Sequence, residues 1–101
     1  MIIYNVTIKI EIGAADAWLQ WMKNEHMADV LSTGLFFDCK LYKLLEQDET
    51  EGITFVAQYH CHTMEQYDEY INLHADTMRT KGLKLFAGKF VAFRTVMEKM
   101  G

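Results

Sequence analysis

Histidine, amide and arginine side chains are the residues of this chain with the clearest potential for chemistry. His60 and Gln58 alternate within the segment from Ile53 to Cys61, and this period of two places both on its more polar side. An imidazole can transfer a proton near neutral pH, and an amide can orient a carbonyl or hydroxyl group. We therefore predict His60 as a catalytic candidate, although polar contacts at a subunit interface would explain the same pattern.

Three more polar residues are expected near His60. Asn5 and Tyr42 alternate onto the corresponding side of their own segments, residues 2–12 and 35–45. Arg94, in the last apolar segment, would supply a cation to the same group. The predicted ligand-binding residues are therefore Asn5, Gln58, Arg94 and Tyr42.

His26 is the second catalytic candidate. It lies at helical spacing from Met22 and Val30 on the apolar stripe of the segment from Ala14 to Leu31, which also contains both tryptophans. A neutral core histidine bonded to a backbone carbonyl is one interpretation, and a ligand-binding or proton-transfer residue is the other. His74 lies on the apolar stripe of a later segment and allows the same two interpretations.

No motif for a metal or a cofactor is present. His60 and His62 alternate around Cys61, but no further ligands follow at a fixed spacing. Cys39 and Cys61 form no CxxC pair and are interpreted as reduced, buried thiols, with a disulfide between neighbouring strands as the alternative. The chain also lacks a P-loop, a GxGxxG fingerprint and a GxSxG elbow, so we expect neither a metal nor a cofactor.

Composition and charge exclude several classes of protein. The net charge is −4 and the ten Lys and Arg residues are scattered, so neither a nucleic-acid partner nor an anionic membrane surface is expected. No apolar run is long enough to cross a bilayer, and the N-terminal segment lacks the features of a signal peptide. Hydrophobic residues make up 50% of the chain and proline is absent, which predicts one globular domain over residues 1–101. Two cysteines are too few to stabilise a secreted domain of this size, so we expect the domain to be cytoplasmic.

Hydrophobic periodicity predicts the order of the main elements. Strands are expected over residues 2–12, 35–45, 53–61 and 89–100. One helix is expected over residues 14–31, and a second begins at the capping box of Thr63 and Gln66 and ends at Gly82, before a short helical turn over residues 83–87. This order predicts a ferredoxin-like βαββαβ domain of the α+β class, with both helices on one face of a four-stranded antiparallel sheet.

One face of this sheet would have no cover in a monomer. The last strand would add to it one of two sets, either Phe90, Ala92, Arg94 and Val96 or Val91, Phe93, Thr95 and Met97. Either set exposes apolar area that a second copy of the chain would cover, so a homodimer through this open face is expected. A semi-polar cleft on the same face would suit a small-molecule ligand.

Four segments resemble a known family over nearly the whole chain. They read M-I-I-Y-N-V-T at the N-terminus, W-L-Q-W-M-K-N-E-H in the first helix, T-G-L-F after it, and G-K-F-V-A-F-R-T near the end. They resemble the DUF4286 family of uncharacterised bacterial proteins, which is similar in architecture to the dimeric α/β-barrel superfamily. The resemblance implies a ferredoxin-like protomer and a back-to-back dimer. It implies no catalytic residues, because the family has none assigned.

Three functional hypotheses remain open. The first is a homodimeric small-molecule-binding protein or cofactor-independent enzyme of the dimeric α/β-barrel type, with its pocket on the open face. The second is a non-enzymatic structural or regulatory homodimer. The third is haem binding or degradation, because Asn5 and His74 resemble in placement the asparagine and haem-ligating histidine of haem-degrading members of that superfamily. Against it, Tyr59 and His60 stand where those enzymes have a tryptophan.

Overall fold

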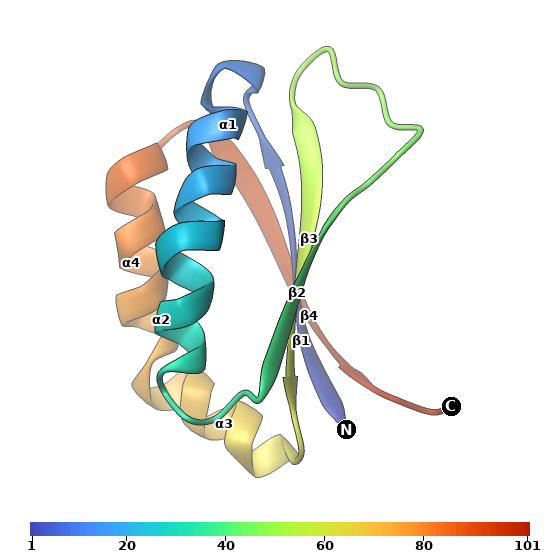
Figure 1. Cartoon of the computed structure of the whole chain (residues 1–101), viewed down its shortest axis with the longest axis vertical. Helices are drawn as coiled ribbons and strands as arrows, with labels where there is room; N and C mark the ends of the chain where they lie inside the picture. The colour runs from blue at the N-terminus through green and yellow to red at the C-terminus, as the bar shows by residue number, and fades with distance from the viewer.

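The computed structural model describes residues 1–101, which form one four-stranded sheet and a layer of helices. In chain order the elements are β1 (Ile2–Ile10), α1 (Ile12–Trp21), the π-helical turn η1 (Met22–His26), α2 (Met27–Leu31), β2 (Asp38–Lys43), β3 (Ile53–Cys61), α3 (Met64–Leu73), α4 (Ala75–Phe86) and β4 (Phe90–Glu98). The strand order is β2-β3-β1-β4, and every neighbouring pair is antiparallel. The helices lie on one side of the sheet (Figure 1), which is the predicted ferredoxin-like α+β fold. None of these helices is long and apolar enough to span a membrane.

Alternation along β1 separates two faces of the sheet. Tyr4, Ile8 and Ile10 are buried beneath the helices, on what we call the covered face. Asn5 and Thr7 point to the opposite side, which we call the open face. Every residue of β1 has a partner in both β3 and β4, so the same alternation continues across three strands.

The first helical segment is one uninterrupted rod made of α1, η1 and α2 (Figure 1). It begins at Ile12, two residues before the predicted start, so Ile12 and Gly13 belong to its first turn and not to the end of the first strand and the connection after it. It ends at Leu31, and Gly34, with a φ of +79°, turns the chain away after it. The π-helical turn in its middle has no signal in the sequence, because the apolar stripe keeps an α-helical period.

The second helical segment begins at the predicted capping box but continues past the predicted end. The Thr63 hydroxyl accepts a hydrogen bond from the Gln66 N–H (3.2 Å), and Gln66 Oε1 accepts one from the Thr63 N–H (3.3 Å). His74 separates α3 from α4, and α4 continues through Gly82 to Phe86. Gly82 is therefore not a helix stop, and the separate turn predicted after it is the last turn of α4.

The strand β2 is shorter than predicted, because it begins at Asp38 instead of Leu35. Phe36 packs into the core, whereas Phe37 is 51% exposed and stacks on His62 with 4.4 Å between ring centroids. A strand that began at Leu35 would place Phe37 on the buried side and Phe36 on the other side, and the structure has the reverse. The chain before Asp38 lies outside the paired strand and keeps one backbone hydrogen bond to β3, from the Phe37 N–H to the His60 carbonyl (2.9 Å), so its side chains need not follow a period of two.

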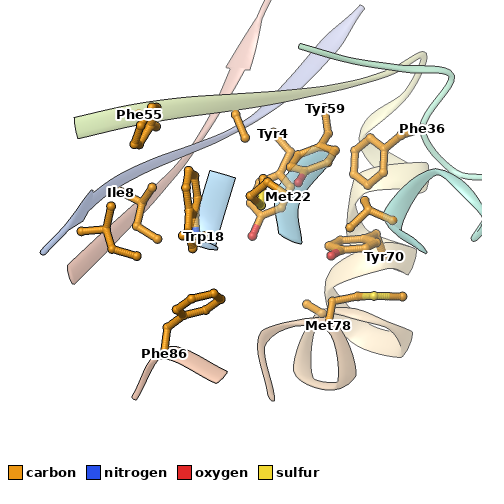
Figure 2. Packing of buried hydrophobic residues seen from close by; sticks show 14 of the residues in the cluster. Tyr4, Ile8, Trp18, Met22, Phe36, Phe55, Tyr59, Tyr70, Met78 and Phe86 are labelled. Atoms are coloured by element: carbon orange, nitrogen blue, oxygen red, sulfur yellow. The ribbon is translucent and has the colours of Figure 1, made fainter. Parts of the chain in front are cut away.

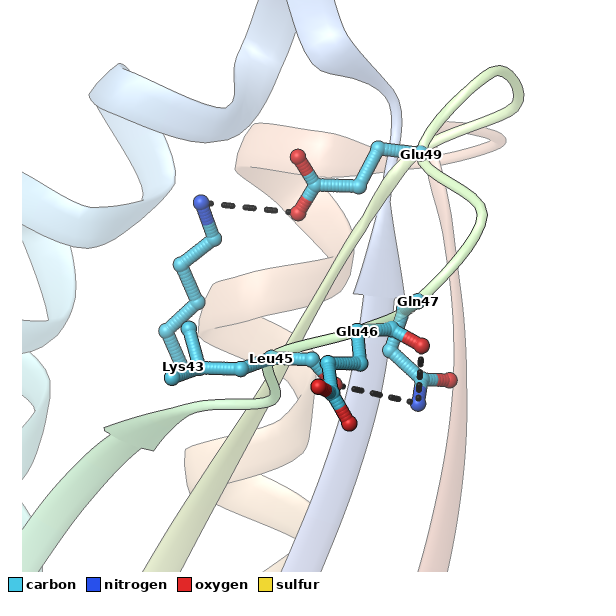
Figure 3. Close-up of polar contacts among 5 residues, drawn as sticks. All are labelled: Lys43, Leu45, Glu46, Gln47 and Glu49. Carbon is cyan, nitrogen blue, oxygen red and sulfur yellow. Dashed lines mark hydrogen bonds and ion pairs between the residues drawn. The ribbon is translucent and has the colours of Figure 1, made fainter.

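The loop between β2 and β3 is polar and exposed, as its run of carboxylates predicts. Lys43 Nζ lies 3.4 Å from Glu49 Oε2 (Figure 3). Gln47 donates hydrogen bonds to the carbonyls of Leu45 and Glu46. These contacts lie within the loop and the adjoining end of β2, so the carboxylates are a solvated hairpin connection.

The core lies between the sheet and the helices and is rich in aromatic rings (Figure 2). Trp18 of α1 stacks on Phe55 of β3, with 5.1 Å between ring centroids. The ring centroid of Tyr4 lies 5.9 Å from that of Tyr59 and 5.7 Å from that of Tyr70, so β1, β3 and α3 meet at one aromatic cluster. Aromatic pairs of this kind contribute roughly 0.5–1.5 kcal/mol each beyond the area that they bury.

The substitution Phe55→Ala tests the packing of this core. Phe55 is 6% exposed and supports the Trp18 ring, so we expect its removal to lower the free energy of unfolding by about 3–5 kcal/mol. Urea unfolding measures this loss. The control Leu45→Ala, at a side chain that is 74% exposed, should change the free energy by less than about 0.5 kcal/mol. Equal losses in the two variants would contradict the assignment of the core.

Candidate functional site

The sheet divides the predicted site residues between its two faces. Asn5 is paired with Gln58, and both lie on the open face. Arg94 is paired with Val6, and it points to the covered face. The prediction that Arg94 joins Asn5 and Gln58 is therefore wrong. The last strand is apolar on both sides, so its sequence does not show which set of side chains lies on the open face. The pairing of Phe90 with Ile10 places the set of Phe90, Ala92 and Arg94 on the covered face.

The open face brings together part of the predicted group. Gln58 Nε2 donates to Asn5 Oδ1 (3.3 Å), and Asn5 Nδ2 donates to Thr7 Oγ1 (3.3 Å). Tyr42 lies on the same face opposite Val56 and is 47% exposed. None of these side chains lines a cavity.

His60 is placed at one end of the open face. It is paired with Ile3 and Asp38, and it is 9% exposed because its surroundings include the ring of Phe37, 6.1 Å away. Its Nε2 atom has no hydrogen-bond partner within the chain. His60 therefore lies beyond the contact between Asn5 and Gln58 and outside any cavity.

A cavity of about 70 Å³ lies between the covered face and the helices. Aromatic side chains from the sheet and from the helices line this cavity, namely those of Tyr4, Trp18, Trp21, Tyr59, Tyr70, Phe86 and Phe90. Figure 2 shows Tyr4, Trp18 and Phe86 pointing from different elements into this layer. The nitrogen-bearing side chains besides the tryptophans are His26, Arg79 and Arg94. The predicted open-face cleft belongs to a dimer and stays a prediction, whereas this cavity of the single chain lies on the other side of the sheet.

The π-helical turn η1 positions His26 at this cavity. It begins after Trp21 and ends at His26, and the two rings stack with 4.4 Å between centroids and 23° between planes. A π-helical turn adds a residue to the helical repeat, and such turns occur frequently at functional sites. Of the two predicted catalytic residues, His26 is therefore the one that borders this cavity.

Gly82 of α4 lies against the Trp21 ring. A Cβ atom at this position would lie 3.2 Å from Cη2 of Trp21, closer than ordinary van der Waals contact. The absence of a side chain therefore lets the indole lie against α4. This close approach is the physical reason for a glycine inside a helix at position 82.

The environment of His26 keeps its imidazole neutral. Burial lowers the pKa of His26 to about 4, and the positive charges of Lys81 and Arg94 act in the same direction, whereas Asp29 opposes them. The Nδ1 atom is buried and has no hydrogen-bond partner within the chain. The neutral form agrees with the interpretation as a core histidine, but the expected bond to a backbone carbonyl is absent from Nδ1.

Arg79 is a charged residue at the cavity that no sequence motif indicated. Its Nη2 donates to the Tyr4 hydroxyl (3.2 Å), and its buried Nε has no hydrogen-bond partner. In the sequence, only its position indicates that Arg79 could face the cavity. It follows Met78 in α4 and precedes Gly82 by about one helical turn. An arginine next to the apolar stripe of a helix is also a common surface residue, so this signal is weak.

The structure offers no evident metal site. No group of three His, Cys, Asp or Glu side chains lies close enough together to hold an ion. Cys39 and Cys61 are free thiols. Burial, with a contribution from Asp38, raises the pKa of Cys39 to about 12, so this thiol stays protonated.

The residues that resemble a haem site do not come together. Asn5 lies on the open face, whereas His74 lies between α3 and α4 with its ring 6.2 Å from Tyr70. Neither residue lines the cavity. The sheet separates the two side chains, so they do not fit a shared haem group.

The pH dependence of stability tests the buried state of His26. Its pKa in the folded chain, about 4, is below the ordinary value of 6.5, so the unfolded chain binds the proton more tightly. Stability should therefore fall as the pH drops from 6.5 towards 4, by on the order of 3 kcal/mol from this group. Denaturant unfolding of the wild type and of His26→Gln measures the free energy of unfolding of each protein at each pH. The difference between the two gives the contribution of His26, because both proteins share the same carboxylates. Parallel stability curves for the two proteins over this pH range would refute the burial of His26.

Solved structures with this fold match the chain over nearly its full length. HapK from Hahella chejuensis is similar with a TM-score of 0.70 and 14% identity, over 100% of this chain and 94% of that chain. A monooxygenase from the gene ActVA-Orf6 of Streptomyces coelicolor, in complex with the ligand nanaomycin D, has a TM-score of 0.61 and 13% identity, over 99% and 88%. A dimeric ferredoxin-like protein from an uncultured marine organism has a TM-score of 0.68 and 15% identity, over 100% and 96%. Identities this low establish the fold alone.

The family follows from a match in sequence. No curated protein matches the chain significantly. The family described as "Domain of unknown function (DUF4286)" matches residues 1–100, which include every strand and helix of the structure. The chain therefore belongs to the DUF4286 family.

Proposed function

We propose that this DUF4286 protein is a homodimer that binds a small, mainly apolar molecule in the cavity between its sheet and its helices. The observation that carries the proposal is a pair of buried polar atoms without partners, His26 Nδ1 and Arg79 Nε, in residues that line an otherwise aromatic cavity. A bound molecule with polar substituents would give both atoms a partner.

The energetic argument starts from the cost of such atoms. A buried donor or acceptor without a partner destabilises the folded state by roughly 1–3 kcal/mol, and native proteins contain few of them. Two of the three buried side-chain atoms of this kind belong to residues that line the same cavity. Their convergence is what a binding site would produce, whereas packing alone would favour apolar side chains at both positions.

The size of the cavity limits what can bind. Its volume of about 70 Å³ is several times the roughly 10–15 Å³ that one water molecule needs, and it is below the roughly 300–1,000 Å³ of typical ligand sites. Arg94 lines it and is itself exposed, which gives the cavity a polar mouth. An apolar cavity of about 150 Å³ holds one benzene ring, so this cavity takes up only part of a ring system and the rest of the ligand remains at the mouth.

The solved relatives in fold support this assignment by analogy. The Streptomyces coelicolor monooxygenase was crystallised with a small-molecule ligand, nanaomycin D, on a fold that matches 99% of this chain. At 13% identity this likeness carries no substrate over to the DUF4286 protein. The assignment therefore rests on the cavity.

The open face supports the homodimer. It exposes apolar side chains on β4, among them Phe93 at 70% and Val91 at 64%. A second copy of the chain, placed with its own open face against them, would bury this area and would also cover Asn5 and Gln58. One similar structure is described as a dimeric ferredoxin-like protein. In this arrangement the open-face polar residues, with Tyr42 and His60, are interface contacts.

Ligand binding is tested with a neutral aromatic probe, naphthalene-2-carboxamide. Binding to the folded state alone should raise the free energy of unfolding by about 2.7 kcal/mol at a probe concentration of a hundred times Kd. Thermal unfolding with and without the probe measures the rise. Ala92→Phe, which places a ring in the cavity wall, should abolish it, because Ala92 lines the cavity.

The matched control is Leu83→Phe. It also adds a ring, but at a side chain of α4 that is 53% exposed, so the stabilisation by the probe should persist. No stabilisation of the wild type up to the solubility limit of the probe would contradict the proposal. It would leave the structural or regulatory homodimer as the better account.

The dimer is tested by Phe93→Lys. A lysine at the centre of the proposed interface would have to be buried without a partner, so the variant should sediment as a monomer where the wild type sediments as a dimer. The control Leu45→Lys changes an equally exposed residue in the loop and should leave the dimer intact. A wild type that is monomeric at all concentrations in analytical ultracentrifugation would disprove the homodimer.

A further inference from the structure

We propose that the ligand of this cavity is a planar aromatic anion, whose ring lies among the aromatic side chains and whose acidic group is bound by Arg94 and Arg79. This inference rests on the proposed function and names the chemical class of the molecule. Its basis is the charge of the cavity, the positions of the two guanidinium groups and the shape of the apolar wall.

The first step concerns charge. Arg79 and Arg94 are the ionised side chains among the lining residues, and no carboxylate lines the cavity. Arginine stays protonated at any pH at which the protein is folded. The chain has 14 Asp and Glu residues and ten Lys and Arg residues, so it has more carboxylates than cations with which they could form ion pairs. Yet the ion pairs of the chain use lysines only, and both cavity arginines lack an acidic partner.

The second step concerns position. Arg79 reaches the cavity from α4 and uses Nη2 on the Tyr4 hydroxyl, which leaves its buried Nε free to donate. Arg94 reaches it from β4, on the other layer, opposite Val6. The guanidinium groups thus approach one space from the helices and from the sheet. Arginine binds carboxylates through two parallel N–H donors, and such charge-assisted bonds are about twice as strong as neutral ones.

The third step concerns the remaining polar atom. His26 is neutral, so it adds no positive charge that would bind a second anion. Its free Nδ1 can donate to or accept from a substituent on the ring of the ligand, depending on the tautomer. The site therefore carries two fixed positive charges and one neutral polar contact, which suits a molecule with one acidic group and one hydroxyl or carbonyl.

The last step concerns the body of the ligand. Rings from both layers line the cavity, among them Trp21, Tyr59 and Phe86. Aromatic side chains prefer offset or edge contacts with flat rings. A cationic ligand would meet two like charges in a partly desolvated space, and an aliphatic anion would forgo the ring contacts. A flat aromatic acid would match both the positive charge and the aromatic lining of the cavity.

The test compares three molecules of the same shape, naphthalene-2-carboxylate, naphthalene-2-carboxamide and naphthalene-2-carboxamidine, which are anionic, neutral and cationic. Calorimetric titration of the wild-type protein should give a Kd for the carboxylate at least about tenfold below that for the carboxamide, because hydrogen bonds to a charged group are about twice as strong as those to a neutral one. The amidine should bind weakest. Arg94→Met should remove most of the preference while the carboxamide still binds, which shows that the cavity remains folded.

The matched control is Lys81→Met. Lys81 lowers the pKa of His26 by its charge but does not line the cavity, so its loss should leave the preference for the carboxylate unchanged. Equal affinity of the wild type for carboxylate and carboxamide would overturn this inference and leave the proposed binding function standing. Binding of none of the three would overturn both. A preference that survives in Arg94→Met and in Arg79→Met would show that neither guanidinium selects the anion.

Discussion

The pairing of β1 with β3 and β4 along its whole length is the constraint on which the rest of the structure depends. Nine consecutive residues of β1 have partners on both sides, so a shift of one residue would move every side chain of the strand to the wrong face. This register places Tyr4 and Ile8 under the helices. It also decides that Arg94 faces the cavity, because Arg94 lies opposite Val6.

The two faces that result have different chemistry. The covered face meets aromatic side chains from the helices and leaves a cavity bordered by His26, Arg79 and Arg94. The open face carries the hydrogen-bonded amides of Asn5 and Gln58 beside exposed apolar residues of β4. In our account the first face binds a ligand and the second binds another copy of the chain. The sheet supports both because its side chains alternate.

Several elements could be predicted from the sequence because their signals are local. Residues 53–61 alternate without interruption, and the predicted strand has the bounds of β3. The capping box of Thr63 and Gln66 is likewise present as predicted, since its two hydrogen bonds join residues three positions apart. The ferredoxin-like fold follows from the order of such elements and from the handedness of their connections.

The site could not be predicted in the same way, because its residues come together through tertiary packing. Arg94 lies in a strand that is apolar on both sides, so alternation alone does not give its direction. Gly82 has the residue type of a helix stop, and only the Trp21 ring against it explains its place inside α4. The π-helical turn that carries His26 breaks the regular helical period without any mark in the sequence.

The methionines allow the most direct test of the central claim, which is that the cavity and not the open face binds the ligand. Met22 and Met78 line the cavity, whereas Met97 lies on the open face opposite Ile3. Titration of protein labelled with ¹³C at the methionine methyl groups with naphthalene-2-carboxylate would follow both faces in one NMR spectrum. We expect shifts and intermolecular NOEs at Met22 and Met78, with Met97 unperturbed. Changes confined to Met97 would contradict the account and return the site to the open face.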